Sequence, residues 1–425
     1  MNHWLLGLRW LFVASGLVSS LGGCSSNSNG TSGTGGSQAA GGNSNASSGG
    51  NTQGGGTAAA GGSVAGGTAG ASSVAVIGKA LSTGSDFVCA ALSDGTVSCW
   101  GAGYRGELGN GAGVDSQVPV KVSGVTNATA VAAGVTHGCT LLATGAIQCW
   151  GVNGSGELGN NTTTDKLAPA PVSGISDAIA VSTGNAFTCA VLTGGGVKCW
   201  GNNGSGQLGN GGNASSSLPM SITALSNAKG VTAGDAQACA LLSDGTVQCW
   251  GSNASGELGN GSTLDSSVPV AVPNLTNVVS VSTGTGHTCA ALSDGTAQCW
   301  GNNSHGELGD GTTTSRLSPV AVSGISTASR VAAGPMHSCA VLKSGSISCW
   351  GSNPVGELGN GTITNSPTPV TVTGINNAES VALGPNYSCE LDLAGSAKCW
   401  GHNSYGQLGN NSTNNSSVPV AANLF

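Results

Sequence analysis

Charged and aromatic side chains are scarce in this 425-residue chain. Only 7% of its residues are charged and 4% are aromatic, and 11 basic against 18 acidic residues give a net charge of −7. Because binding to a phosphate backbone needs a basic stripe, this composition argues against a nucleic-acid partner. After the N-terminus no apolar run reaches the roughly 20 residues that span a bilayer. Glycine is abundant, at 75 residues, which is typical of an all-β protein with many tight turns.

A Cys-Trp-Gly tripeptide recurs every 50 residues, with no insertion or deletion between copies. Its seven tryptophans are Trp100, Trp150, Trp200, Trp250, Trp300, Trp350 and Trp400. A fixed period of this length indicates a repeat architecture. Units so alike leave little room for a dedicated active site, and we expect neither enzymatic activity nor a cofactor or metal.

A second cysteine precedes each tripeptide, so fourteen of the fifteen cysteines form seven pairs ten residues apart. The intervening Ser93-Asp94-Gly95 and its equivalents predict a hairpin whose type I turn ends in a left-handed glycine. That register sets the two cysteines opposite each other, within disulfide range. Zinc binding is the alternative, but this spacing is unusual for zinc and no histidine column accompanies every pair. We expect an oxidising compartment and the disulfides Cys89–Cys99, Cys139–Cys149, Cys189–Cys199, Cys239–Cys249, Cys289–Cys299, Cys339–Cys349 and Cys389–Cys399.

Each unit has four strand-like segments, which in the unit 128–177 are residues 130–134, 139–142, 146–150 and about 169–172. Four strands are the content of one propeller blade, so the sequence predicts a seven-bladed β-propeller over residues 74–425. A proline recurs in the fourth segment, as expected of an edge strand. The chain ends on such a segment, and none precedes the first unit. We therefore expect the C-terminal strand to complete the first blade and close the ring.

The N-terminal 23 residues have the features of a secretory signal, with Arg9 ahead of a short apolar core. They end in Leu21-Gly22-Gly23-Cys24, which resembles the lipobox of bacterial lipoproteins. That resemblance implies lipidation of Cys24; an ordinary cleaved signal is the alternative. Residues 24–73 are rich in Gly, Ser and Asn, and we expect them to form a flexible tether. The predicted product is a monomer, exported and lipid-anchored to the bacterial cell envelope, at the outer membrane or cell surface.

The repeat also resembles a known family. From Gly284 to Gly311 the chain reads GTGHTCAALSDGTAQCWGNNSHGELGDG, and all seven units share this pattern. It is similar to the regulator of chromosome condensation repeat, and the resemblance implies a seven-bladed β-propeller. The family's namesake exchanges nucleotide on a small GTPase with a wedge-like insertion; no unit here carries an insertion, so we do not expect exchange. Secreted bacterial propellers of this repeat type that inhibit β-lactamases imply that a bare ring can bind protein.

Two columns of the repeat carry polar side chains whose roles the sequence leaves open. We expect the first column to satisfy loop backbone groups between blades, because Gln replaces Glu in it, although a cation-binding ring is the alternative. Its members are Glu107, Glu157, Gln207, Glu257, Glu307, Glu357 and Gln407. For the second column we favour packing, with contact at a blade rim as the alternative. That column holds Phe87, His137, Phe187, Gln237, His287, His337 and Tyr387.

The most varied positions lie three and four residues after the glycine of Cys-Trp-Gly. Bulky side chains gather there in units one, five, six and seven, which are neighbours on a closed ring. We predict a recognition sector formed by Tyr104, Arg105, His305 and Tyr405, with uncorrelated drift as the alternative.

The seventh unit breaks the pattern with Glu390 and Asp392, which lie two apart on one strand face. Paired carboxylates can perform acid–base chemistry. We favour instead a local shift of the blade in which Leu391 and Leu393 pack.

These observations predict an extracytoplasmic scaffold for an unknown protein or glycan partner. The alternatives are a glycan- or cell-wall-binding module like a lectin, a binder like the β-lactamase inhibitors, a hydrolase with its site in the central funnel, and a purely structural envelope element.

Overall fold

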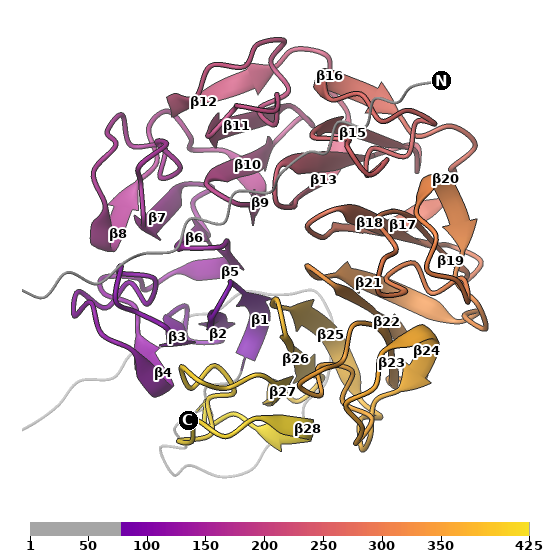
Figure 1. Cartoon of the computed structure of the whole chain (residues 1–425). Coiled ribbons are helices and arrows are strands. Elements are labelled where there is room, and N and C mark those ends of the chain that lie inside the picture. Colours follow the sequence, from indigo (N-terminus) through magenta and orange to yellow (C-terminus); the bar gives the residue numbers. More distant parts are fainter. Residues whose placement is uncertain (1–77, 425) are drawn as a thin grey trace, which may run out of the picture. The chain divides into compact units, whose positions relative to one another are not determined.

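The computed structural model describes residues 78–424. The predicted signal sequence, the lipidation residue Cys24 and the tether 24–73 lie outside the described residues. In the described part, four-stranded antiparallel sheets form seven blades around a ring (Figure 1). This confirms the seven-bladed propeller of 50-residue repeats. No helix among residues 78–424 is long and apolar enough to cross a membrane.

Each blade consists of four strands that are consecutive in the sequence and pair in that order. The first blade holds β1 (Gly78–Thr83), β2 (Phe87–Leu92), β3 (Val97–Gly101) and β4 (Ser116–Lys121). The strands of the other six blades are β5 (Ala128–Ala133), β6 (His137–Leu142), β7 (Ile147–Gly151), β8 (Lys166–Pro171), β9 (Ala178–Thr183), β10 (Phe187–Leu192), β11 (Val197–Gly201), β12 (Ser216–Ile222), β13 (Ala228–Ala233), β14 (Gln237–Leu242), β15 (Val247–Gly251), β16 (Ser266–Ala271), β17 (Val278–Thr283), β18 (His287–Leu292), β19 (Ala297–Gly301), β20 (Arg316–Ala321), β21 (Ala328–Ala333), β22 (His337–Leu342), β23 (Ile347–Gly351), β24 (Ser366–Thr371), β25 (Ala378–Leu383), β26 (Tyr387–Asp392), β27 (Ala397–Gly401) and β28 (Ser416–Ala421).

The first strand of each blade lies nearest the centre of the ring and the fourth lies at its periphery (Figure 1). The recurring prolines, such as Pro119 in β4, fall on these peripheral strands. An edge strand has one side without a sheet partner, so a missing backbone N–H is tolerated there. The prediction of an edge position is confirmed.

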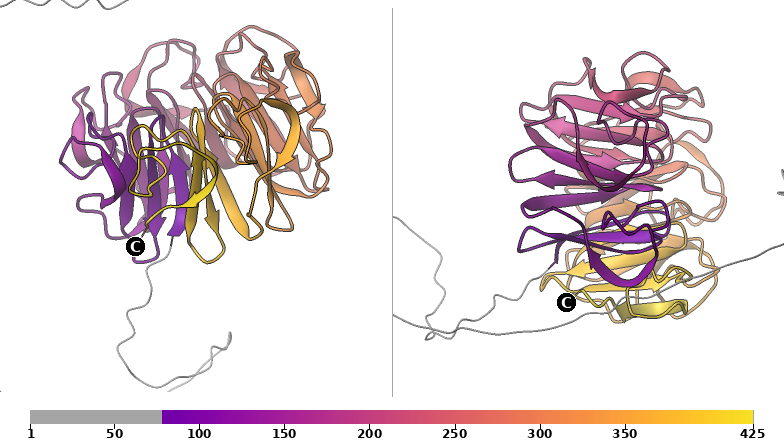
Figure 2. Two further views of the ribbon diagram at one scale, coloured as in Figure 1. Left: turned by 60° about the horizontal axis from the view of Figure 1, so that its bottom comes forward. Right: turned by 90° about the vertical axis from the view of Figure 1, so that its left-hand side faces the viewer.

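The antiparallel order gives the ring two distinct faces, and Figure 2 shows the blades from two further directions. The first we call the loop face: it carries the β1–β2 and β3–β4 connections and their equivalents in the other blades. The second we call the turn face: it carries the β2–β3 turns and the connections between blades. A hydrogen bond from Ala102 N to Asp86 O (2.8 Å) joins the two loops of the first blade, as the antiparallel order requires.

The hairpin between the two middle strands of each blade carries the disulfide. In the first blade the amide of Gly95 donates to the carbonyl of Leu92 (3.0 Å), and Gly95 has the left-handed φ of +80° that the turn needs. Cys89 and Cys99 are paired in register. All seven predicted disulfides form, with Cα–Cα distances of 4.0–4.1 Å.

The recurring tryptophan joins each blade to the one before it. Trp150 is fully buried in the apolar cluster of the first blade, and its indole N–H donates to the backbone carbonyl of Glu107 at 2.7 Å. A Cβ on Gly109 would lie 2.9 Å from the indole ring, so the Leu-Gly of the repeat leaves room for the tryptophan. Equivalent bonds of 2.7–3.0 Å occur at all seven seams.

The expected closure by strand exchange is wrong. β28 pairs with β27 in its own blade, and the first blade begins with β1 and ends with β4. The ring instead closes through the same side-chain seam as elsewhere, since Trp100 donates to the carbonyl of Gln407 at 3.0 Å. The hydroxyl of Tyr387 adds a bond to the carbonyl of Phe87 at 2.7 Å. Because residues 78–83 already supply an innermost strand, every blade is complete without borrowing from its neighbour.

Candidate binding face

The Glu/Gln column braces the β3–β4 loops and their equivalents. In each loop a side-chain oxygen accepts a hydrogen bond from the backbone N–H two residues earlier, as Glu107 does from Arg105 at 2.9 Å. Gln407 makes the same bond to Tyr405 at 2.9 Å, so the bond does not depend on charge. All seven members do this. The predicted backbone role is confirmed, but the link between blades comes from the backbone carbonyl that accepts the tryptophan.

Burial of this column changes the pKa of its glutamates. Desolvation raises the pKa of four glutamates, Glu107, Glu157, Glu257 and Glu357. Within residues 78–424 no group of three or more His, Cys, Asp or Glu side chains is placed to hold a metal ion.

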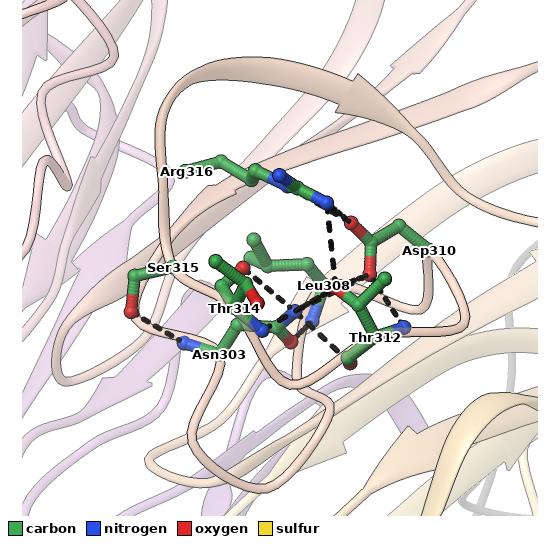
Figure 3. Close-up of polar contacts among 7 residues, drawn as sticks. All are labelled: Asn303, Leu308, Asp310, Thr312, Thr314, Ser315 and Arg316. Carbon is green, nitrogen blue, oxygen red and sulfur yellow. Dashed lines mark hydrogen bonds and ion pairs between the residues drawn. The ribbon is translucent and has the colours of Figure 1, made fainter.

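An asparagine two residues after Cys-Trp-Gly organises the loop in six blades; Figure 3 shows the fifth. The side-chain oxygen of Asn303 accepts from the amide of Leu308 (2.9 Å), and its NH₂ group donates to the carbonyls of Thr312 and Thr314 (both 3.1 Å). In the same loop Arg316 forms an ion pair with Asp310 at 2.9 Å. Such a fully hydrogen-bonded hub fixes the loop as a rigid element. The first blade has Gly103 at this position.

A further column at the end of the loop caps the backbone of the hub residue. Asp165 accepts from the amide of Asn153 at 2.8 Å, and Asn365 accepts from the amide of Asn353 at the same distance. The cap therefore works with a carboxylate or with an amide. Neither the hub nor the cap was predicted from the sequence, although the Gly-x-Asn pattern after six of the seven repeat tryptophans was a visible signal.

The predicted recognition sector is exposed on the loop face. The Glu/Gln column accepts hydrogen bonds from the backbone N–H groups of Arg105, His305 and Tyr405, and Nδ1 of His305 also lies 3.2 Å from Oε1 of Glu307. Tyr104 is 57% exposed, Tyr405 is 39% exposed and the side chain of His305 is 41% exposed. The guanidinium of Arg105 lies over the Tyr104 ring at 5.4 Å from its centroid, a cation–π distance.

The ring arrangement places Tyr405 and Tyr104 on loops of neighbouring blades, because the amide of Asn411 donates to the carbonyl of Gln117 (3.1 Å), joining the seventh blade to the first. His305 lies two blades before Tyr405. The sector remains a prediction, since exposure alone does not show binding.

The side chains of the column before the first cysteine are buried at the seams between blades. All seven side chains are at most 1% exposed, so they pack and do not form a contact rim. His137 contacts Thr188 of the next blade through Nε2 (2.9 Å), and the threonine donates onward to the carbonyl of Glu157 (2.9 Å). His287 and His337 contact Ser338 and Ser388 in the same way, at 2.8 Å. Desolvation lowers the pKa of His137 and His287 to about 4 and that of His337 to about 3.

A funnel opens at the centre of the loop face, with a cavity volume of about 280 Å³. A ring of glycines surrounds it, and a Cβ on Gly134 would lie 2.6 Å from the carbonyl oxygen of Gly184. The glycines therefore allow neighbouring blades to approach closely. Asp235 is the one ionisable side chain among the described residues that line the funnel, and Asn185 donates to it at 2.8 Å.

The two acids of the seventh blade have separate environments. Asp392 accepts from the amides of Ala394 (2.9 Å) and Ser396 (2.8 Å), and so replaces the turn cap that Asp94 provides in the first blade. Leu391 is buried as expected, but the prediction for Leu393 is wrong because it lies in the turn and is 72% exposed.

Glu390 is fully buried on the strand face that packs toward the preceding blade. Neither of its oxygens accepts a hydrogen bond from the described residues. Lys398 lies opposite, with Nζ 3.9 Å from Oε1. Desolvation raises the pKa of Glu390 to about 7. Ala340, in the same column of the sixth blade, packs into the cluster of the fifth.

Comparisons with known proteins agree with this architecture. The family model of the RCC1-like domain matches residues 97–424, and that of the Regulator of chromosome condensation (RCC1) repeat matches residues 79–107. No curated protein matches the chain in sequence.

Solved structures show the same fold at low sequence identity. Human WBSCR16 has a TM-score of 0.68 and 22% identity, over 76% of this chain and 92% of that one. Yeast RCC1 (Prp20), bound to Kap60, has a TM-score of 0.66 and 21% identity, over 79% and 83%. Prp20p from Saccharomyces cerevisiae, studied for its binding to Gsp1p and histones, has a TM-score of 0.65 and 22% identity, over 81% and 87%. Given the family model that spans most of its repeats, the chain belongs to the RCC1-like domain family of β-propellers.

Proposed function

We propose that this propeller is a non-catalytic protein-binding scaffold whose loop face meets a protein partner. The observation that carries the proposal is the contrast between backbone and side chains in the β3–β4 loop and its equivalents. The backbone is fixed by the Glu/Gln column, while the side chains of Tyr104 and Tyr405 project into solvent. Aromatic side chains on a rigid frame lose little conformational entropy on binding, which makes them good anchors.

The relatives support this class of function. The similar yeast propeller is seen bound to Kap60 and binds Gsp1p and histones. We carry over only that a ring of this fold can bind proteins. In the proposed setting, a lipid on Cys24 and the tether 24–73 hold the ring at the bacterial cell envelope. The seven disulfides are compatible with that setting, because disulfides persist in oxidising compartments.

The proposal is tested by partner capture followed by affinity measurement. The full chain captures proteins from envelope extracts, and the partner is identified, purified and titrated against variants. Tyr104→Ala with Tyr405→Ala is expected to weaken binding about 10-fold or more, as truncation of two aromatic anchors does. The matched control removes exposed apolar side chains at the turn-face ends of two innermost strands, Ile179→Ala with Val279→Ala. A partner whose affinity falls only in the control contradicts the loop face as the binding surface.

A further inference from the structure

The charge of the ring is divided unequally between its faces. Residues 78–424 contain ten basic and eighteen acidic side chains. Each can be assigned to the nearer end of its strand or to its loop. Three basic and eleven acidic side chains then belong to the loop face, and seven of each belong to the turn face. The entire net charge of −8 in the described residues therefore lies on the loop face.

Five of the loop-face acids, Asp86, Asp115, Asp165, Asp235 and Asp265, are accessible to solvent, and a sixth, Asp310, has a side chain that is only 9% exposed. The other five are the buried glutamates of the Glu/Gln column. Of the three basic residues on this face, Arg316 is paired with Asp310 and Arg105 lies over Tyr104. The field of the face is therefore negative, and clefts in such a face concentrate it.

Folding does not require this charge. Asp115, Asp165 and Asp265 cap the hub position of their loops, with bonds of 2.8–2.9 Å. Asn365 and Asn415 make the same cap in the sixth and seventh blades, at 2.8 and 2.9 Å. The carboxylates thus add charge beyond what the loop needs for its own structure.

One polar side chain that lines the funnel at the centre of this face has no hydrogen-bond partner among the described residues. Thr183 lines the funnel, is 8% exposed, and its hydroxyl makes no hydrogen bond among the described residues. The reason is local: the equivalent Thr283 bonds to Thr232 of the preceding blade at 2.9 Å, whereas Thr183 meets a blade with Ala132 at that position. The funnel is therefore lined by a hydroxyl without a partner among the described residues and by the carboxylate of Asp235, and both can accept hydrogen bonds from an entering cationic group.

Exposed apolar side chains on the β3–β4 loop and on its equivalents in other blades favour a protein over a small cation. Tyr104 and Tyr405 are accompanied by Leu264 and Ile363, which are 76% and 66% exposed. A surface that combines negative charge with exposed apolar anchors is complementary to a basic protein surface.

From these features we infer that the partner of the loop face is a protein with a basic docking surface, which presents a lysine or arginine side chain or an amino terminus to the funnel. This inference rests on the proposed function and specifies its partner. Charge complementarity steers association and fixes orientation, while the aromatic side chains supply contact area.

The test uses two triple variants that remove the same charge from opposite faces. Asp115→Asn, Asp165→Asn and Asp265→Asn neutralise the loop face with a residue the chain already uses there. Asp94→Asn, Asp244→Asn and Asp294→Asn do the same on the turn face, where these residues cap the hairpin turns. The probe is fluorescein-labelled decalysine, titrated against the full chain by fluorescence anisotropy at low salt.

The loop-face triple is expected to bind decalysine about 3- to 10-fold more weakly than the parent, and the turn-face triple to bind within about 2-fold of it. Asp235→Asn alone is expected to weaken binding as well. Equal weakening by both triples, or equally tight binding of decaglutamate, overturns the inference.

The captured partner separates this inference from the function on which it rests. If the tyrosine variants weaken the partner but the loop-face triple does not, the scaffold function stands and the basic partner is wrong. If neither weakens it, both fail. A neutral glycan that binds the loop face equally well in parent and triple also overturns the inference.

Discussion

At the scale of single residues, Glu390 stands out because the ring does not compensate its burial. Six blades have a small or hydroxyl side chain in this column, as with Ala340 and Thr140, and the seventh has a buried carboxyl without a hydrogen bond. A buried charge costs free energy unless it is well paired, and Lys398 at 3.9 Å pairs it only loosely.

Glu390→Ala is therefore expected to stabilise the ring. The pKa of Glu390 is raised to about 7, so the folded state holds a proton that the unfolded state has released. Stability of the parent then falls as pH rises from about 4.5 to about 7, by about 2–3 kcal/mol from this group. At pH 7.5 the variant should be more stable by about 1–3 kcal/mol, with the gain shrinking toward pH 5. Urea unfolding at both pH values measures it.

The exposed acid of the neighbouring strand, Glu379, provides the control. Glu379→Ala removes the same charge and should change stability by less than about 0.5 kcal/mol. An equal gain in both variants would show that net charge matters and that burial of Glu390 does not.

The buried histidines give stability the opposite pH dependence to Glu390: they lower stability as the solution is acidified. Their pKa values of about 4 and 3 lie below the value in an unfolded chain, so the unfolded state takes up protons first as the solution is acidified. Their stabilising contribution is complete above about pH 6.5 and is lost as pH falls toward 4. His137→Phe follows the example of Phe87 and Phe187 in the same column. It should remove about 2–3 kcal/mol of the acid loss between pH 6.5 and 4.

Thermal melts across this pH range measure the effect of His137→Phe. Gln237→Phe, at a buried member of the same column that does not titrate, is the control and should leave the acid dependence unchanged. If His137→Phe keeps the full acid loss of the parent, the buried neutral state of His137 is contradicted.

At the scale of the strands, the hairpin disulfide is the repeated stabilising device. Closing a loop of about 11 residues stabilises by about 2.5–3 kcal/mol in the chain-entropy model. Cys239→Ala with Cys249→Ala should therefore lower the free energy of unfolding by about this amount and leave the fold intact, as judged by circular dichroism and urea titration. A loss below about 1 kcal/mol would show that the hairpin is already ordered without its disulfide.

The blade, as a set of four consecutive strands, is the second unit at this scale. The connections between blades span six residues, such as 122–127. A two-residue linker from Phe425 to Gly78 reproduces this length, and new termini can then be opened between Val125 and Thr126. Because no strand is exchanged at the closure, this permutant should fold with a Tm within about 5 °C of a parent truncated to the same residues. A permutant that fails to fold would indicate that the original closure has a special role.

At the scale of the whole molecule, the sequence predicts the blade architecture better than it predicts the blade to which each strand belongs. The period of Trp100 and its equivalents and the spacing of Cys89 and Cys99 are local signals, so the blades and their disulfides could be predicted. Which segment of the 50-residue repeat begins a blade cannot be determined from neighbouring residues alone. The outermost segment at residues 416–421 therefore suggested a strand exchange that the structure does not have.

The site shows the same limit. The exposed positions of Tyr104 and Tyr405 could be predicted because they vary between repeats that are otherwise alike. Packing of His137 was the favoured prediction and is confirmed, but its partner could not be predicted, because the serine or threonine that it contacts lies on the next blade, 51 residues away. The charge division depends on which loops share a face, and this appears only once the antiparallel order is known.

The central claim is that the ring binds its partner through the loop face. Hydrogen–deuterium exchange of the full chain, alone and with the captured partner, tests it most directly. The account predicts that the partner protects amides in the loops 102–115 and 402–415 and leaves the turns at 93–96 and 393–396 unchanged. Protection confined to the turns or to the peripheral strands would contradict it.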